Sequence, residues 1–276
     1  MKKVISFGDS FTAGLGVDRN TEEKILGNHP NWKHMNQEQK HKQREIANKF
    51  RADNSFTKFF SDNYNVDFKN LGEIGCNNKR ILNQIFNYDD VHGFEVGDFV
   101  IIGWTSSMRD KLPFFPSLFN DNIMSGLTWS VKELPLIVSG EQKISFSDET
   151  QRKKWEPFWK EYIKKYITEL YDERYFEVYN INLISLVQSF LDYKKIDYIM
   201  FDAFESMLQK SHSSINTEKY WGFGKKTFSS YVESFNDESL LELDGYNLND
   251  VIAKHPSKTG HELFTKELIK FYDKRT

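Results

Sequence analysis

The sequence is poor in the features that mark disulfide-rich, zinc-binding and membrane-spanning proteins. It contains a single cysteine, Cys76, among 276 residues, which excludes an intramolecular disulfide framework and a cysteine-based zinc site. No apolar run approaches the roughly 20 residues that a transmembrane helix needs. The first residues lead directly into a predicted strand, without the charged leader and apolar segment of a secretory signal. We therefore expect a soluble protein that is not exported by a signal of its own.

A strong charge of either sign is also missing. The chain has 37 lysines and arginines against 40 aspartates and glutamates, for a formal net charge of −3, and the two signs are interspersed. The stretch that looks most basic, 33–51, also carries Glu38 and Glu45, so it is typical of a solvated polar helix. Nothing in the charge pattern favours nucleic acid as a partner.

Aromatic residues, by contrast, are abundant, with 24 Phe, 13 Tyr and 6 Trp. This excess has two explanations: rings that line a sugar-binding or partner-binding surface, or codon usage that favours Phe and Tyr together with Ile, Asn and Lys. The length of 276 residues suits one large α/β domain or two small ones. We expect a single domain with insertions at about 18–55, 112–155 and 209–240.

Short apolar runs rich in β-branched and aromatic residues predict four strands, Lys3–Phe7, Asn65–Asn70, Asp98–Gly103 and Ile196–Phe201. Helical periodicity is found over Gln37–Phe50, Phe56–Asn63, Lys79–Phe86, Trp155–Val187 and Glu262–Tyr272. Strands that alternate with helices indicate a parallel sheet with helices on both faces. Right-handed crossovers then bring the turns after the strands to one edge, where ligands bind in open α/β sheets.

One of these turns carries a serine suited to nucleophilic attack. The first strand runs into Gly8, and Ser10 follows two residues later, just before a short helical stretch. A serine at this position projects from the carboxyl edge of the sheet, next to backbone N–H groups that can stabilise an oxyanion. The alternative is that Ser10 only caps the helix that follows, which is the more common use of a serine after a strand.

Four blocks of the sequence together resemble the GDSL-type hydrolases of the SGNH superfamily. They are Gly8–Phe11 (Gly-Asp-Ser-Phe), Asn70–Gly75 (Asn-Leu-Gly-Glu-Ile-Gly), Val100–Ser106 (Val-Ile-Ile-Gly-Trp-Thr-Ser) and His255–His261 (His-Pro-Ser-Lys-Thr-Gly-His). Each block alone is a weak signal, whereas their order and spacing are specific. The resemblance implies a three-layer α/β/α fold with a flavodoxin-like parallel sheet of about five strands. It also implies a serine hydrolase without a metal or cofactor.

The resemblance assigns catalytic roles to residues of these blocks. Ser10 is the expected nucleophile and His255 the expected general base, because an imidazole with a pKa near neutrality can take the serine proton during attack. The backbone N–H groups of Ser10 and Gly75 are expected in the oxyanion hole. His261 stands in the place of a second, structural histidine. Its spacing from His255 matches no common metal-ligand pattern.

The third block departs from the family pattern at the oxyanion hole. The family has Gly-x-Asn-Asp, whereas Thr105 stands here where the asparagine is expected. The third donor is then Thr105, Ser106, or a nearby amide, Asn77 or Asn78, although each of these residue types is also common in turns without a catalytic part. We expect Thr105 to complete the hole.

Residues around this turn are also the expected substrate contacts. They are Asn77, Asn78, Trp104, Ser106 and Arg109. The guanidinium of Arg109 is suited to a carboxylate or phosphate of the substrate, and a surface salt bridge is its other use.

The block around His255 departs from the family at the orienting acid. The family has an aspartate three residues before the histidine, and this position is Ile252. Asp250, two residues further back, is our candidate for the third catalytic residue, and Asp244 is a weaker one. Otherwise a backbone carbonyl holds the histidine and the enzyme works as a dyad. An orienting partner fixes the tautomer and stabilises the imidazolium, so its absence slows catalysis without abolishing it.

These residues predict a serine esterase that hydrolyses a small acyl ester through an acyl-enzyme. The range of the family and the aromatic insertions favour an O-acetyl group on a carbohydrate. The third block and the Asn-Asn-Lys-Arg-Ile sequence at 77–81 also resemble hydrolase-like proteins of bacteriophages, which implies a host polysaccharide as substrate and a location in the cytoplasm or on the virion. The alternative is a hydrolase fold that has lost catalysis and binds a glycan or another protein.

Overall fold

The computed structural model describes residues 1–26, 35–74, 76–105, 161, 173–204, 206–208, 210–243 and 254–275. This part of the chain is built on a parallel sheet of five strands in the order β2-β1-β3-β4-β5. The strands are β1 (Lys3–Gly8), β2 (Asp67–Asn70), β3 (Asp98–Trp104), β4 (Asp197–Asp202) and β5 (Tyr220–Trp221). Because this is the strand order of flavodoxin-like sheets, the predicted fold class is confirmed.

The three central strands are buried along nearly their whole length. All seven residues of β3 are buried, as are five of the six in β1 and five of the six in β4. Parallel strands that are covered by helices on both faces need such continuous apolar runs. This requirement explains why these strands can be recognised from the sequence.

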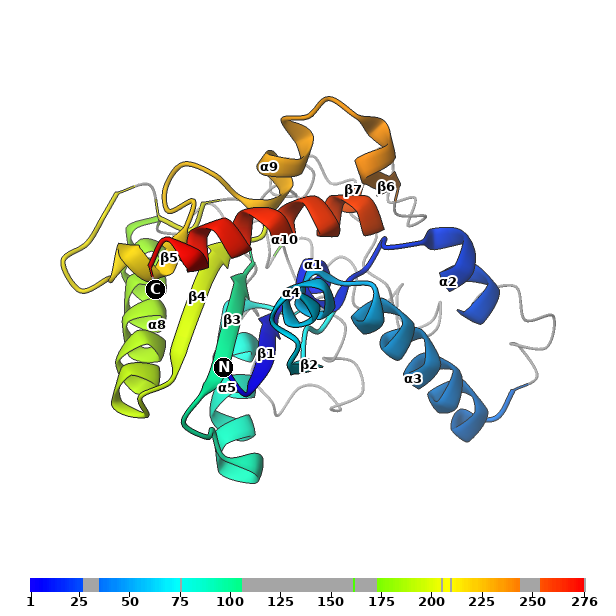
Figure 1. Ribbon diagram of the computed structural model, residues 1–276, viewed down its shortest axis with the longest axis horizontal. Helices are drawn as coiled ribbons and strands as arrows, with labels where there is room; N and C mark the ends of the chain where they lie inside the picture. The colour runs from blue at the N-terminus through cyan, green and yellow to red at the C-terminus, as the bar shows by residue number, and fades with distance from the viewer. Residues whose placement is uncertain are drawn as a thin grey trace.

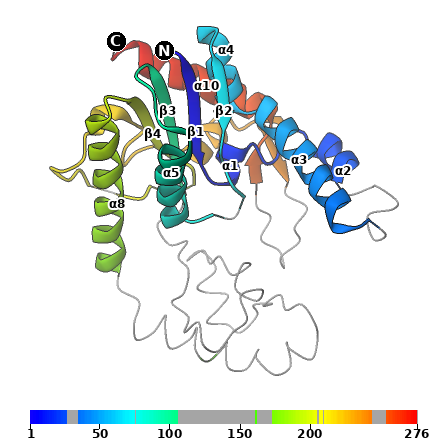
Figure 2. The ribbon, with the colours of Figure 1, turned by 90° about the horizontal axis from the view of Figure 1, so that it is seen from below.

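Helices α5 (Asn78–His92) and α8 (Glu173–Tyr193) cover one face of the sheet, and α4 (Phe56–Tyr64) and α10 (Lys258–Asp273) cover the other (Figure 2). The first layer packs a mainly aliphatic core on the sheet, which includes Ile81, Ile85, Ile184, Val187 and Leu191. The second packs a largely aromatic core, which includes Phe56, Phe60, Phe99, Phe201, Phe228 and Phe264. Eight of the 24 phenylalanines are buried in these two cores.

Two further helices, α2 (Arg19–Leu26) and α3 (Gln37–Asp53), lie side by side beyond the β2 edge of the sheet (Figure 1). An ion pair between Arg51 and Glu22 joins them, and both of these side chains are largely buried. These helices account for most of the described residues in the predicted insertion at 18–55. The predicted insertion at 112–155 lies outside the described residues.

The segment 211–237, which falls in the predicted insertion at 209–240, contains regular structure. It forms the 3₁₀ turn η6 (Thr217–Lys219), the edge strand β5 and helix α9 (Phe228–Glu233). The strand has only two residues, too few to show a period of alternation in the sequence. After it, η7 (Glu238–Leu240) leads into an antiparallel pair, β6 (Leu241–Leu243) and β7 (Lys254–Pro256).

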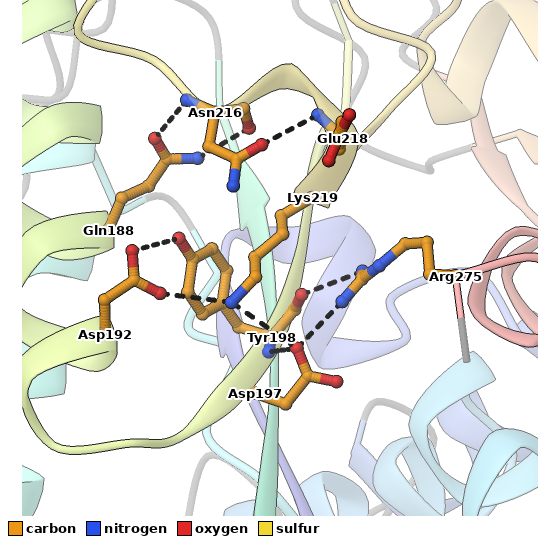
Figure 3. A network of polar contacts seen from close by, with 8 residues as sticks. All are labelled: Gln188, Asp192, Asp197, Tyr198, Asn216, Glu218, Lys219 and Arg275. Carbon is orange, nitrogen blue, oxygen red and sulfur yellow. Dashed lines mark hydrogen bonds and ion pairs between the residues drawn. The ribbon is translucent and has the colours of Figure 1, made fainter.

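A polar network ties the amino end of β4 to its surroundings (Figure 3). Lys219 Nζ lies 3.1 Å from an Asp192 carboxylate oxygen and 3.6 Å from one of Asp197, and 4.2 Å from the centre of the Tyr198 ring. Arg275, just after α10, donates to Asp197 at 2.8 Å and to the Tyr198 carbonyl at 3.0 Å. This network lies at the end of β4 opposite the turns that follow the strands, so it stabilises the fold away from the site.

In the described ranges, no helix combines the length and the apolar character that crossing a bilayer requires. Within the same ranges, no group of three or more His, Cys, Asp and Glu side chains is arranged to hold a metal ion.

Candidate active site

Ser10 is the first residue of the short helix α1 (Ser10–Ala13), directly after β1. The cap of this helix is Asp9, whose carboxylate accepts a hydrogen bond from the Phe11 N–H at 3.0 Å. The alternative in which Ser10 caps its helix is therefore wrong. Asp9 takes over the capping, and the hydroxyl of Ser10 is left for another use.

Paired glycines allow α1 to lie across the ends of two strands. Gly8 of β1 and Gly103 of β3 are register partners, and a Cβ atom on them would lie 2.0 Å and 2.5 Å, respectively, from Thr12 Oγ1. Only glycine leaves room for this approach. Ser10 and Thr105 each stand two residues beyond this pair, so they leave the sheet edge from neighbouring strands.

His255 lies against this serine. Its Nε2 is 2.9 Å from Ser10 Oγ, and both residues are buried, with 4% and 3% of their surface exposed. Strand β7 carries His255, and α10 begins three residues later with Ser257 as its cap. The Lys258 N–H donates to the Val17 carbonyl at 2.9 Å. The start of α10 is thereby fixed to the loop that follows α1.

The imidazole of His255 packs beside a pair of aromatic rings. The Phe11 ring centre lies 4.9 Å and the Phe204 ring centre 6.1 Å from that of His255, and the two phenylalanine rings are 4.0 Å apart. Phe11 is fully buried, whereas Phe204, two residues past β4, is only partly buried. The described surroundings of this imidazole are therefore largely apolar.

The loop after β2 is fastened to the serine turn at several points. The Gly8 carbonyl accepts hydrogen bonds from the Glu73 N–H at 2.9 Å and from the Cys76 thiol at 3.3 Å. The Asn70 side chain donates to the Thr12 carbonyl at 2.6 Å. Gly75, the expected oxyanion-hole donor, lies outside the described residues, and its described neighbours on both sides are held against β1 and α1.

Thr105 follows β3 and is fully buried. The Asn78 carboxamide binds its backbone twice: Oδ1 accepts from the Thr105 N–H at 3.0 Å, and Nδ2 donates to the Thr105 carbonyl at 3.2 Å. The side-chain hydroxyl of Thr105 has no hydrogen-bond partner among the described residues. Since buried hydroxyls are nearly always paired, this one is available to a bound group.

The remaining predicted site residues have different surroundings. Asn77 is the cap of α5, where its Oδ1 accepts from the Arg80 N–H at 2.9 Å. Trp104 is fully buried in the core on the α5 and α8 face. Ser106, Arg109 and Asp250 lie outside the described residues, as do Asp244 and Ile252. Contacts of these residues with a substrate stay predictions.

Two titratable side chains near the site are strongly shifted by burial. Burial, and after it the neighbouring His255, lowers the pKa of His261 to about 3, so His261 is neutral at physiological pH while its Nδ1 accepts from the Phe56 N–H at 3.2 Å. Burial raises the pKa of Asp202 to about 7, against the hydrogen bonds that this carboxylate accepts. The donors include the Tyr220 hydroxyl at 2.5 Å and the Met207 N–H at 3.3 Å.

Sequence reasoning missed two residues near the pair, and it gave a third residue, Asn78, a different role. Glu242 of β6 stands directly opposite His255 of β7 in the antiparallel ladder, and opposite residues in such a pair carry side chains on the same face. Phe204 and the bridging role of Asn78 were also missed. Phe204 could have been found from the sequence, because it follows a predicted strand and so lies at the sheet edge where ligands bind. The roles of Glu242 and Asn78 depend on strand register and packing, which one sequence does not reveal.

No protein-family model matches the chain, and no curated protein matches it. Among solved structures, a G-D-S-L family protein from Desulfitobacterium hafniense DCB-2 is 14% identical, with a TM-score of 0.38, over 98% of this chain and 99% of that one. A member of the lipolytic protein G-D-S-L family from Veillonella parvula DSM 2008 is 11% identical, with a TM-score of 0.41, over 98% and 97% of the two chains. Both alignments span nearly the full length of the two chains, and both proteins differ from this chain in sequence at most positions.

Proposed function

We propose that this protein is a serine esterase that hydrolyses a small acyl ester through a covalent acyl-enzyme. The observation that carries the proposal is the pair of Ser10 Oγ and His255 Nε2, 2.9 Å apart and buried at the carboxyl edge of the sheet. A nucleophile within hydrogen-bond reach of a base is the signature of covalent acyl transfer.

In the proposed first step, Ser10 Oγ attacks the ester carbonyl carbon while His255 Nε2 takes the hydroxyl proton. The carbonyl oxygen becomes an oxyanion. We assign its stabilisation to the N–H groups of Ser10 and Gly75 and to the Thr105 hydroxyl. The Ser10 N–H is the first of α1, so no carbonyl of its own helix can accept from it. Each such donor typically contributes about 3 kcal/mol of transition-state stabilisation.

The intermediate then collapses to the acyl-enzyme. The bond to the leaving alkoxide breaks, and the imidazolium of His255 returns its proton to that oxygen, which leaves as the alcohol. Water attacks the acyl-enzyme in the same way, with His255 as base, and releases the carboxylic acid and free Ser10. We assign the orientation of His255 to Asp250, which would fix the tautomer with Nε2 facing the serine.

Support for a small acyl group comes from the bulk of the rings beside the base, because Phe11 and Phe204 occupy space that a long chain would need. Within the proposal the substrate is an O-acetylated carbohydrate, such as a polysaccharide of a bacterial host surface. Of the expected contacts, the proposal keeps Asn77, Ser106 and Arg109, because Trp104 is fully buried in the core and the Asn78 carboxamide is bound to the backbone of Thr105. The resemblance of the third block to bacteriophage hydrolase-like proteins supports this substrate class.

The test is turnover of p-nitrophenyl acetate by the wild type, Ser10→Ala and His255→Ala. We expect measurable turnover by the wild type and a decrease of about 10³-fold or more in each variant, because removal of either partner ends covalent catalysis. Equal background rates in the wild type and Ser10→Ala, also with acetylated oligosaccharides, would support the alternative of a binding module. Acetate release from acetylated oligosaccharides then tests the carbohydrate specificity.

A further inference from the structure

The side chain of Asn78 forms a two-point bridge to the backbone of a single residue, Thr105. Its Oδ1 accepts from the Thr105 N–H at 3.0 Å, and its Nδ2 donates to the Thr105 carbonyl at 3.2 Å. The second hydrogen of Nδ2 has the Met207 sulfur as a neighbour at 3.6 Å. Asn78 and Thr105 are almost completely buried. The carboxamide therefore satisfies both the N–H and the carbonyl group of the Thr105 backbone.

This bridge connects the two loops that carry the proposed oxyanion donors. Asn78 is the first residue of α5, three positions after Gly75 in the loop that follows β2. Thr105 comes directly after β3. The strands β2 and β3 do not pair with each other, because β1 lies between them. The two loops are therefore not joined by hydrogen bonds between paired strands. The Asn78 bridge joins them directly, across the end of β1.

We propose that Asn78 is a positioning residue of the oxyanion hole, which holds the Thr105 hydroxyl at a fixed place relative to the Gly75 loop. This inference rests on the proposed esterase function. Asn78 acts through Thr105 and does not touch the oxyanion, since its oxygen and both hydrogens of its nitrogen already face other groups. A hydroxyl is shorter than the carboxamide that the family places in the third block, so its backbone needs closer control to reach the same oxyanion.

The physical basis is the cost of misplacing an electrostatic donor. Donors aimed at an oxyanion act only when they are held in place before the reaction, and loss of one costs about 10²–10³-fold in kcat. A displacement of about 1 Å can cost roughly 100-fold. Removal of the bridge leaves the Thr105 N–H and carbonyl without their side-chain partner in a buried place, so the turn will rearrange to satisfy them.

The test is a double-mutant cycle of Asn78→Ala and Thr105→Val, with kcat and KM measured on p-nitrophenyl acetate. We expect Asn78→Ala alone to lower kcat by about 10- to 100-fold with little change in KM, because the lost interaction is made only in the transition state. In the Thr105→Val background, where no hydroxyl remains to be positioned, Asn78→Ala should lower kcat by less than about 3-fold further.

A matched control is available at Gln188. Its carboxamide makes the same type of bridge to Asn216, with Nε2 donating to the Asn216 carbonyl at 3.0 Å and Oε1 accepting from the Asn216 N–H at 2.9 Å (Figure 3). Gln188 is also almost fully buried. Gln188→Ala removes the same interactions from α8, and because Asn216 is exposed to solvent it should lower the melting temperature by no more than Asn78→Ala does and leave kcat unchanged.

Each outcome decides the proposal. Three results would overturn the positioning role of Asn78 while leaving the esterase function in place. They are an equal effect of Asn78→Ala in both backgrounds, a wild-type kcat in Asn78→Ala, and a loss of kcat in Gln188→Ala as large as that in Asn78→Ala. Absence of ester turnover in the wild type overturns both. If Asn78→Ala fails to fold, Asn78→Ser takes its place in the cycle with the same expected non-additivity.

Discussion

Gly16 lies directly against His255. A Cβ atom on Gly16 would be 2.7 Å from His255 Cβ, and Gly16 has a φ of +90°, in the region that favours glycine. The loop that follows α1 thus limits the positions that His255 can occupy. The hydrogen bond from the Lys258 N–H to the Val17 carbonyl, at 2.9 Å, fixes the same loop to the segment after His255. Together these contacts couple the position of His255 to that of Ser10.

The first prediction is that Gly16→Ala lowers kcat by about 10- to 100-fold, because the added methyl pushes His255 away from Ser10. The positive φ adds about 1–2 kcal/mol of strain. Gly93→Ala is the control, since Gly93 has a φ of +71° and nothing within 4 Å of the position of a Cβ. That variant adds the strain of a positive φ without the clash, so it should lose some stability, measured by urea unfolding, and keep its kcat. A wild-type kcat in Gly16→Ala would contradict the coupling.

The second prediction concerns the group that orients His255. We expect Asp250→Asn to lower kcat by about 10³- to 10⁴-fold, because an amide in this place favours the wrong tautomer of the imidazole. Glu242→Gln is the comparison, since Glu242 stands opposite His255 in the β6–β7 pair. If only Glu242→Gln is impaired, the orienting acid is Glu242 and not Asp250. Wild-type kcat values in both variants would assign the orientation of the imidazole to a backbone carbonyl.

The fold was accessible from the sequence because its central strands are nearly uniform apolar runs. Predicted and observed bounds of β1 and β3 differ by a single residue at the carboxyl end, since burial on both faces leaves few polar positions to confuse the pattern. The two-residue β5 and the β6–β7 pair were not predicted. Strands this short are defined by their partners, and a partner far away in the chain leaves no local signal.

The same limit applies to the candidate site. Ser10 stands between a strand and a helix, which is a local pattern, and His255 was assigned from the resemblance of the block that precedes the last helix. The contact between Asn78 and Thr105 joins residues separated by 27 positions, and the pairing of Glu242 with His255 depends on strand register. Hydrogen-bond partners of this kind are selected by the packed fold, so their side chains carry no sequence pattern of their own.

The third prediction is that Phe204 limits the length of the acyl chain. Its ring packs on Phe11 at 4.0 Å and near His255, but unlike Phe11 it is only partly buried, so it is the ring that a substrate can reach. Phe204→Ala should raise kcat/KM for p-nitrophenyl butyrate relative to acetate by about 10-fold or more, as expected for one or two methylene groups in an apolar pocket. Phe235→Ala, at an exposed ring, should leave the ratio unchanged. An unchanged ratio in Phe204→Ala would place the acyl group elsewhere.

The fourth prediction links the stability of the fold to pH through His261. Burial lowers the folded-state pKa of this side chain from 6.5 to about 3, so between these values the unfolded state binds a proton that the folded state does not. Stability therefore falls as the pH drops below 6.5, by about 1.4 kcal/mol for each pH unit from this group. Asp202, whose pKa is raised to about 7, acts in the opposite direction, since its contribution is lost as the pH rises toward 7.

Replacement of His261 by asparagine isolates the contribution of this side chain to the pH dependence of stability. The Asn side-chain oxygen can still accept from the Phe56 N–H, as Nδ1 of His261 does at 3.2 Å, but it does not titrate. We expect the loss of unfolding free energy between pH 7 and pH 5, measured by urea denaturation, to be about 2 kcal/mol smaller in His261→Asn than in the wild type. His41→Asn, at a side chain that is 74% exposed, should follow the wild type. Parallel curves for all three proteins would mean that the pKa of His261 is the same in the folded and unfolded states, and would contradict the prediction.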